Sequence, residues 1–137
     1  MQDSDFLVFE ESYFVDPKNI KLFAEVAGDP NPIHQDENVA REMGLTAPIA
    51  HGMFIYSYLL RRLDEYLEVL SSKNSKKYKL QEARCRFNNP VAVKNTYKSR
   101  LEVTSHTEQE LKVTALFLDN QSGEKLTQVV ARVSIIN

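Results

Sequence analysis

A stripe of apolar residues at helical spacing runs through the middle of the chain. Its members follow one another at intervals of three and four positions: Met53, Tyr56, Leu60, Leu63, Leu67 and Leu70. This spacing places them on one face of a helix about five turns long. Most charged residues of the segment, such as Arg61, Arg62 and Glu65, fall off that face. We therefore predict one long amphipathic helix after Pro48.

From Tyr78 onward the period of the pattern changes to two. Apolar residues alternate with polar ones in successive runs: Ala83, Cys85 and Phe87; Leu101 and Val103; Leu111, Val113, Ala115 and Phe117; Val129, Ala131, Val133 and Ile135. Such alternation is typical of strands that bury one face. Turn-forming segments at residues 88–90, 105–108 and 119–123 separate the runs.

The first third of the chain predicts a strand and two short helices. Residues 6–15 are rich in aromatic and β-branched side chains, as strands are. Asp16 and Pro17 then form a helix start, and Gly28 ends that helix. Asp36 caps a second short helix that Gly44 closes. Early helices followed by successive strands predict an α+β domain whose antiparallel sheet packs on the long helix.

Composition limits the class of protein. The chain has 137 residues, 42% hydrophobic and 26% charged, so we expect one globular domain over residues 1–137. A net charge of −2 argues against nucleic acid as a partner, because phosphate binding needs a basic excess. One cysteine excludes an internal disulfide framework, and the acidic start lacks an export signal, so we expect a cytoplasmic protein. No apolar run is long enough to cross a membrane.

The candidate chemistry begins directly after the first helix, in the run Gly28-Asp29-Pro30-Asn31-Pro32-Ile33-His34. The two prolines fix alternate φ angles and remove two backbone donors, so this segment is a rigid loop. A rigid loop that carries an acid and an imidazole is typical of a functional site. We expect the Asn31 amide to brace the loop rather than to act on a substrate.

A second block, Ile49-Ala50-His51-Gly52-Met53, lies just before the long helix. Gly52 offers an accessible backbone N–H at the helix start, where a developing oxyanion can be stabilised. His51 precedes it, where its side chain can orient that peptide. Gly52 could instead simply permit close packing at the helix start.

These residues also have other interpretations. Asp29 could be an ordinary turn residue, and His34 could simply bond a backbone carbonyl. A calcium loop starting at Asp29 fails, because His34 and Ala40 occupy the positions of the required Gly and Glu. A zinc site formed by His34, His51 and a carboxylate lacks thiolates and the usual histidine spacing, so no metal is expected.

The two blocks together resemble the MaoC-like, (R)-specific enoyl-CoA hydratase branch of the hot-dog fold. The resemblance rests on Gly-Asp-x-Asn-Pro-x-His followed about twenty residues later by Ala-His-Gly-Met. It implies a single hot-dog domain in which an antiparallel sheet wraps around one long helix. It also implies that Asp29 and His34 form the catalytic dyad, and that Gly52 donates its N–H to the thioester carbonyl.

The function implied by this resemblance is hydration of trans-2-enoyl thioesters to (R)-3-hydroxyacyl thioesters in fatty-acid metabolism. It implies a homodimer, and it implies no cofactor beyond the coenzyme A or acyl carrier protein that forms part of the substrate. Two alternatives stay open, since a fold does not fix a function. One is a hot-dog acyl-CoA thioesterase, and the other is a non-catalytic acyl-binding subunit of a heteromeric dehydratase.

Several residues depart from the family pattern or invite a second interpretation. Leu60 stands where related hydratases often carry a hydroxyl residue, and its unbroken helical spacing favours a core role. Lys94-Asn95 replaces the family's Gly-Asp, and Asn95 is expected to tolerate the left-handed turn. Cys85 is expected to be a core thiol. The basic run formed by Lys73, Lys76, Lys77 and Lys79 is either a solvated loop or a contact for coenzyme A phosphates.

Overall fold

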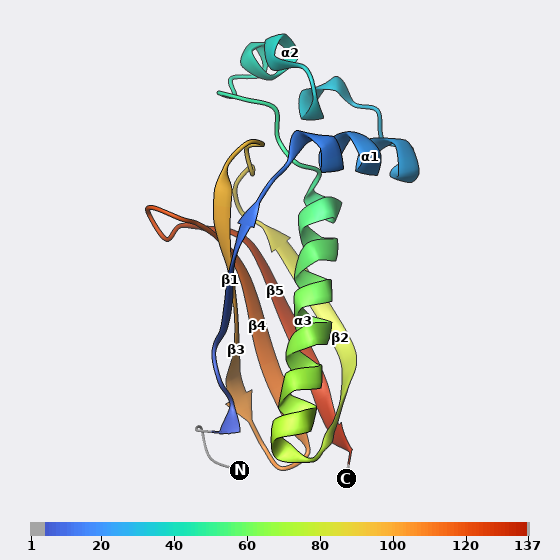
Figure 1. Cartoon of the computed structure of the whole chain (residues 1–137), viewed down its shortest axis with the longest axis vertical. Coiled ribbons are helices and arrows are strands. Elements are labelled where there is room, and N and C mark those ends of the chain that lie inside the picture. The colour runs from blue at the N-terminus through green and yellow to red at the C-terminus, as the bar shows by residue number, and fades with distance from the viewer. Residues whose placement is uncertain (1–4, 137) are drawn as a thin grey trace.

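A five-stranded antiparallel sheet wraps around one long helix in the computed structural model, which describes residues 5–136 (Figure 1). The sheet order is β1-β3-β4-β5-β2, with β1 and β2 at the edges. The strands are β1 (Phe9–Phe14), β2 (Lys77–Phe87), β3 (Thr96–His106), β4 (Glu110–Asp119) and β5 (Lys125–Ile136). The helix along the sheet is α3 (Gly52–Asn74). The predicted α+β architecture is confirmed.

The acidic first four residues, on which the predicted lack of an export signal partly rests, lie outside the described residues. Within the described part of the chain, no helix is both long and apolar enough to cross a membrane.

The predicted alternation of the strands is confirmed most clearly in β4 and β5. Antiparallel pairing sets Val113 opposite Ala131 and Ala115 opposite Val129, so the apolar members of both strands share one face. The buried members of this face are Leu111, Val113, Ala115, Phe117, Val129, Ala131, Val133 and Ile135. Burying them against α3 supplies the main hydrophobic stabilisation of the domain.

The predicted phase of the long helix needs a correction. Met53 is 55% exposed, and Tyr56 and Leu60 are only partly buried. The buried face is centred elsewhere and is broader: Ile55, Tyr58, Leu59, Arg62, Leu63, Tyr66, Leu67 and Leu70. The physical reason is the breadth of the sheet, because α3 contacts β2, β3, β4 and β5 and positions outside a single stripe are therefore buried as well.

Arg62 was wrongly predicted to lie off the buried face. The residue is 5% exposed, and its guanidinium is neutralised by Glu11 from β1 at 2.6 Å and by Glu65 at 2.8 Å. It also lies over the ring of Phe9. A charge can be buried when it is paired in this way.

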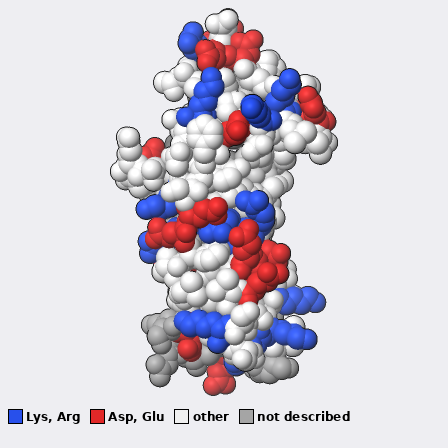
Figure 2. Space-filling model, in the orientation of Figure 1, with Lys and Arg blue, Asp and Glu red and all other residues white. Residues whose placement is uncertain are grey.

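Two short helices and a 3-10 turn cover the N-terminal end of α3: α1 (Pro17–Ala27), η2 (Pro32–His34) and α2 (Glu37–Glu42) (Figure 1). The predicted caps are confirmed, since the Asp16 carboxylate accepts from Lys18 N–H and the Asp36 carboxylate accepts from Asn38 N–H. Charged side chains gather at this end, and an uncharged band lies directly beneath it (Figure 2). The loops that carry the candidate site lie among α1, η2 and α2.

Candidate active site

The loop after α1 has a fixed shape. Gly28 ends α1 with φ of 68°, a left-handed conformation that favours glycine. Asp29 N–H donates to Ala24 carbonyl at 3.0 Å, which ties the loop to the last turn of α1. Asn31 accepts from Ile33 N–H through its side-chain oxygen at 3.1 Å, and its own N–H donates to the Asp29 carboxylate at 3.4 Å. Asn31 thus bonds to the loop backbone on one side and to the Asp29 carboxylate on the other.

A backbone carbonyl fixes the orientation and the tautomer of the His34 ring. Its Nδ1 lies 2.7 Å from the carbonyl oxygen of Ile49. A carbonyl can only accept, so Nδ1 carries the proton in this contact. Nε2 is therefore the ring nitrogen that remains for proton transfer, as an acceptor when the ring is neutral and as a donor when it is protonated.

His51 stacks against His34 from the start of α3. The two ring centroids are 3.6 Å apart with an interplanar angle of 23°. His51 is 4% exposed, and its Nε2 lies 3.3 Å from the Asp29 carbonyl oxygen and 3.9 Å from the Asp29 carboxylate. Burial lowers the pKa of His51, and nearby His34 acts in the same direction. A neutral His51 thus holds the Asp29 backbone and packs on His34.

Asp29, His34 and His51 come together as one cluster. One carboxylate oxygen of Asp29 and one ring nitrogen of each histidine lie within 4.8 Å of one another. The same three side chains could be considered as metal ligands. However, nearly parallel stacked rings direct their nitrogen lone pairs side by side, whereas a tetrahedral ion needs them to converge. His34 Nδ1 is also occupied by Ile49, so the arrangement suits proton transfer better than metal binding.

Gly52 begins α3 beside this cluster. As the first helical residue it has no carbonyl acceptor within the helix, and no other described group accepts its N–H. A Cβ at this position would lie 3.0 Å from the Phe87 ring of β2. The available N–H fits the interpretation of Gly52 as an oxyanion donor. The close Phe87 ring fits the interpretation that Gly52 permits close packing at the helix start.

Two cavities flank the segment between α2 and α3. One has a volume of about 290 Å³ and a mainly apolar lining that includes Gly52, Ile55, Phe87 and Val91. The other, of about 300 Å³, is lined by His34, Pro48 and residues of α1. Ile49 lines the first cavity and also binds His34 through its carbonyl, so one short segment links the two.

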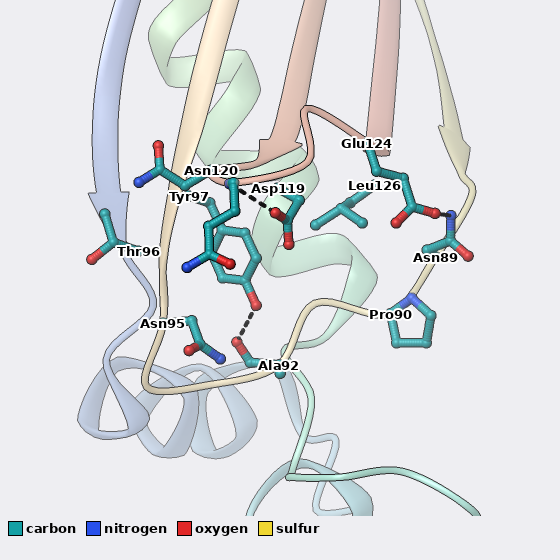
Figure 3. A pocket seen from close by; sticks show the side chains of 11 residues that line it. Asn89, Pro90, Ala92, Asn95, Thr96, Tyr97, Asp119, Asn120, Glu124 and Leu126 are labelled. Carbon is teal, nitrogen blue, oxygen red and sulfur yellow. Dashed lines mark hydrogen bonds between the residues drawn. The ribbon is translucent and has the colours of Figure 1, made fainter.

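A third cavity, of about 540 Å³, contains none of the predicted site residues (Figure 3). Its lining is polar, with the Tyr97 hydroxyl donating to the Ala92 carbonyl at 2.7 Å and the Asn89 amide donating to Glu124 at 2.9 Å. It adjoins the Gly52 cavity, because Asn89 and Pro90 line both.

The basic run that was considered for coenzyme A phosphates lies away from the site. Lys73 is near the end of α3, and a helical rise of about 1.5 Å per residue puts it roughly 30 Å along the axis from Gly52. Within one chain, the run therefore lies far from the His34 cluster. Cys85 is partly buried against the core, and burial raises the pKa of its thiol, which opposes a nucleophilic role.

The family is decided by a match along most of the chain. A family model described as MaoC like domain matches residues 5–122. This chain belongs to the MaoC-like family. All five predicted site residues of this MaoC-like domain lie inside the matched range: Asp29, Asn31, His34, His51 and Gly52.

A characterised relative shares part of the sequence. A stretch of 50 residues is 38% identical to the 3-hydroxyacyl-thioester dehydratase X of Mycobacterium tuberculosis. The match covers 36% of this chain and 18% of that protein, so the MaoC-like chain corresponds to only a small part of the relative.

Solved structures show the same fold at low sequence identity. The ChsH1-ChsH2 complex from Mycobacterium tuberculosis matches with a TM-score of 0.76 and 15% identity, over 95% of this chain and 96% of that one. The (R)-hydratase from A. caviae involved in PHA biosynthesis matches with a TM-score of 0.71 and 22% identity, over 93% and 92%. The expected hot-dog fold of this MaoC-like chain is therefore confirmed.

Sequence reasoning missed two features of this end of the molecule. One is the stacking of His51 on His34, which depends on a contact between a loop and a helix start. The other is that Lys18, Lys21 and Lys94 share the lining of the His34 cavity. The lysines come from α1 and from the loop before β3, and no local pattern links them.

Proposed function

We propose that this protein is an (R)-specific enoyl-CoA hydratase, which adds water reversibly to trans-2-enoyl thioesters. One observation carries the proposal: His34 has Nδ1 fixed by a carbonyl and Nε2 unoccupied, beside the Asp29 carboxylate and the start of α3. An acid, a base and a free backbone N–H are what this hydration requires. The family supports a hydro-lyase in general, and the relative named above is a 3-hydroxyacyl-thioester dehydratase.

The proposed reaction divides between the two members of the dyad. The Asp29 carboxylate takes one proton from water as the water oxygen bonds to Cβ of the enoyl group. The electron pair of the double bond passes to the thioester oxygen as an enolate, and His34 in its protonated form then delivers a proton to Cα. Afterwards the proton on Asp29 returns to His34. A ring nitrogen of His34 and a carboxylate oxygen of Asp29 lie within 4.8 Å of each other, so the two side chains are close enough to act on one substrate.

Gly52 has the electrostatic role in this scheme. Its N–H, assisted by the positive end of α3, would hold the thioester oxygen as negative charge develops there. The apolar cavity beside Gly52 would receive the acyl chain, because Ile55, Phe87 and Val91 give it a hydrophobic lining. The chemistry so described needs no cofactor or metal, and the acyl carrier enters as part of the substrate.

The decisive experiment follows a conjugated enoyl thioester with purified protein. Loss of the enoyl absorbance without release of free thiol would support a hydratase, and chiral analysis of the product would test for the (R) isomer. Release of free thiol would support the thioesterase alternative instead. If the enoyl absorbance stays constant and no free thiol is released, the result would support a binding subunit or a dehydratase that needs a second chain.

We further propose that the active form is a homodimer. Strand β2 lies at an edge of the sheet with Leu80 and Phe87 exposed, and such an edge is prone to pair with a second chain. Light scattering on the active protein should give twice the mass of one chain. A fully active monomer would refute the proposal, and an inactive monomer would favour a heteromeric assembly.

A further inference from the structure

The cavity of about 300 Å³ beside His34 has an unusual concentration of positive charge. Lys18 and Lys21 reach it from α1, and Lys94 reaches it from the loop that precedes β3. All three residues are exposed, so their ammonium groups are available to a ligand in solution. The three cations thus surround the same cavity that one face of His34 lines.

These lysines differ from most arginines of the domain in their partners. Arg62, Arg100 and Arg132 all pair with glutamates. Among residues 5–136, Lys18, Lys21 and Lys94 make no ion pair. The cavity has one carboxylate in its lining, Glu37, and this group faces Arg41 at 3.6 Å. The remaining charge of the cavity is therefore positive and uncompensated.

Lys94 is held in an uncommon backbone conformation. Its φ is 64°, in the left-handed region that glycine adopts without penalty and lysine does not. Two backbone hydrogen bonds with Val15, the residue after β1, fix the turn. Lys94 N–H donates to the Val15 carbonyl at 2.9 Å, and Val15 N–H donates to the Asn95 carbonyl at 3.0 Å. Strained backbone conformations of this kind cluster at active sites and ligand-binding sites.

We propose that Lys18, Lys21 and Lys94 bind the phosphate groups of the coenzyme A carried by the substrate. Phosphate oxygens accept charge-assisted hydrogen bonds from ammonium groups, and three uncompensated cations match the several charges of a phosphorylated nucleotide better than the single charge of a phosphodiester. The inference rests on the proposed function, because the thioester must react beside His34. It selects coenzyme A over acyl carrier protein as the carrier.

The test compares thioesters that differ only in phosphate. A triple variant, Lys18→Gln with Lys21→Gln and Lys94→Gln, is matched by a control triple with the same charge change at the opposite end of the domain: Lys77→Gln, Lys79→Gln and Lys112→Gln. With an enoyl-CoA, the site triple should raise KM by at least about tenfold with kcat unchanged, since each lost ionic hydrogen bond weakens binding several-fold. With the matching enoyl-pantetheine, which has no phosphate, KM should not change. The control triple should behave as the unaltered protein with both.

Two outcomes of these kinetics would overturn the inference. Equal changes with both thioesters would mean that the lysines act on the fold or on the acyl part. An equal loss with an enoyl 4′-phosphopantetheine would assign them to the phosphate that coenzyme A shares with acyl carrier protein. If the unaltered protein hydrates no thioester, the proposed function fails. Calorimetric titration with free coenzyme A then still tests the proposed binding site. In that titration the site triple, and not the control, should weaken affinity about tenfold.

Discussion

The imidazole rings of His34 and His51 stack with their centroids 3.6 Å apart, although 17 positions separate them along the chain. His34 belongs to a rigid turn, whereas His51 is the last residue before α3. The stack therefore joins the loop that carries Asp29 to the helix start that carries Gly52. It gives the candidate site its shape.

The first prediction concerns the dyad. Asp29→Asn and His34→Ala should each lower kcat/KM for enoyl thioesters by about 10²–10⁴-fold, the usual contribution of a positioned acid or base. The double variant should be little worse than either single one, because both groups serve the same proton transfers. Steady-state kinetics checks this, with thermal unfolding as the control for folding. Near-normal turnover in either folded single variant would contradict the assignment.

The second prediction isolates the Gly52 N–H. Proline is tolerated at the first position of a helix, and the preceding His51 already has φ of −62° and ψ of 137°, which is compatible with a following proline. Gly52→Pro should therefore fold, and loss of the donor should lower kcat by about 10²–10³-fold.

Gly52→Ala is the matched control for this change. It keeps the N–H and adds a Cβ near the Phe87 ring, which is half-exposed and can move aside. It should retain much more activity than the proline variant. Equal activity of the two variants would remove Gly52 from the proposed mechanism.

The third prediction is a pH dependence of stability. Burial lowers the pKa of folded His51, so the unfolded chain binds this proton more readily than the folded one does. The stabilising contribution is present above the ordinary histidine value, about 6.5, and is lost as pH falls below it toward the folded pKa. Melting temperatures measured from pH 8 to 5 should fall less steeply for His51→Asn than for the unaltered protein. Parallel curves would mean that His51 does not titrate as inferred.

The fourth prediction follows from the strained turn before β3. Lys94→Gly should raise the free energy of unfolding by about 1 kcal/mol, because glycine adopts a positive φ without the steric penalty of a side chain. Urea unfolding measures the change, and Asn95→Gly, next to it but without a positive φ, is the control. If Lys94→Gly lowers the free energy of unfolding instead, the lysine side chain stabilises the turn and the prediction is wrong.

The fifth prediction concerns the buried guanidinium of Arg62. Glu11→Ala should cost about 1–3 kcal/mol of unfolding free energy, because it removes the partner at 2.6 Å from a group that is 5% exposed while Glu65 remains as a second partner. Glu65→Ala should cost less, since its contact is longer, at 2.8 Å, and its carboxylate is more exposed than that of Glu11, 44% against 37%. Chemical denaturation of both variants checks the order. A larger loss from Glu65→Ala would contradict it.

The sequence by itself determined the secondary structure, the fold class and the candidate chemical groups. Caps such as Asp16 and Gly28 act within a few residues, and the alternation in β4 and β5 records which face is buried, so both can be read locally. The left-handed residue before β3 was predicted wrongly: it is Lys94 and not Asn95, because two hydrogen bonds to Val15 fix the turn one position earlier.

Only the tertiary structure decided how these groups meet. The stack of His34 on His51, the burial of Arg62 and the shared cavity of Lys18, Lys21 and Lys94 all join segments from different elements. Such contacts depend on the curvature of the sheet around α3 and on the placement of α1 across its end, which no local pattern encodes. Side-chain periodicity specifies which face is buried, whereas the partners on that face follow from three-dimensional packing.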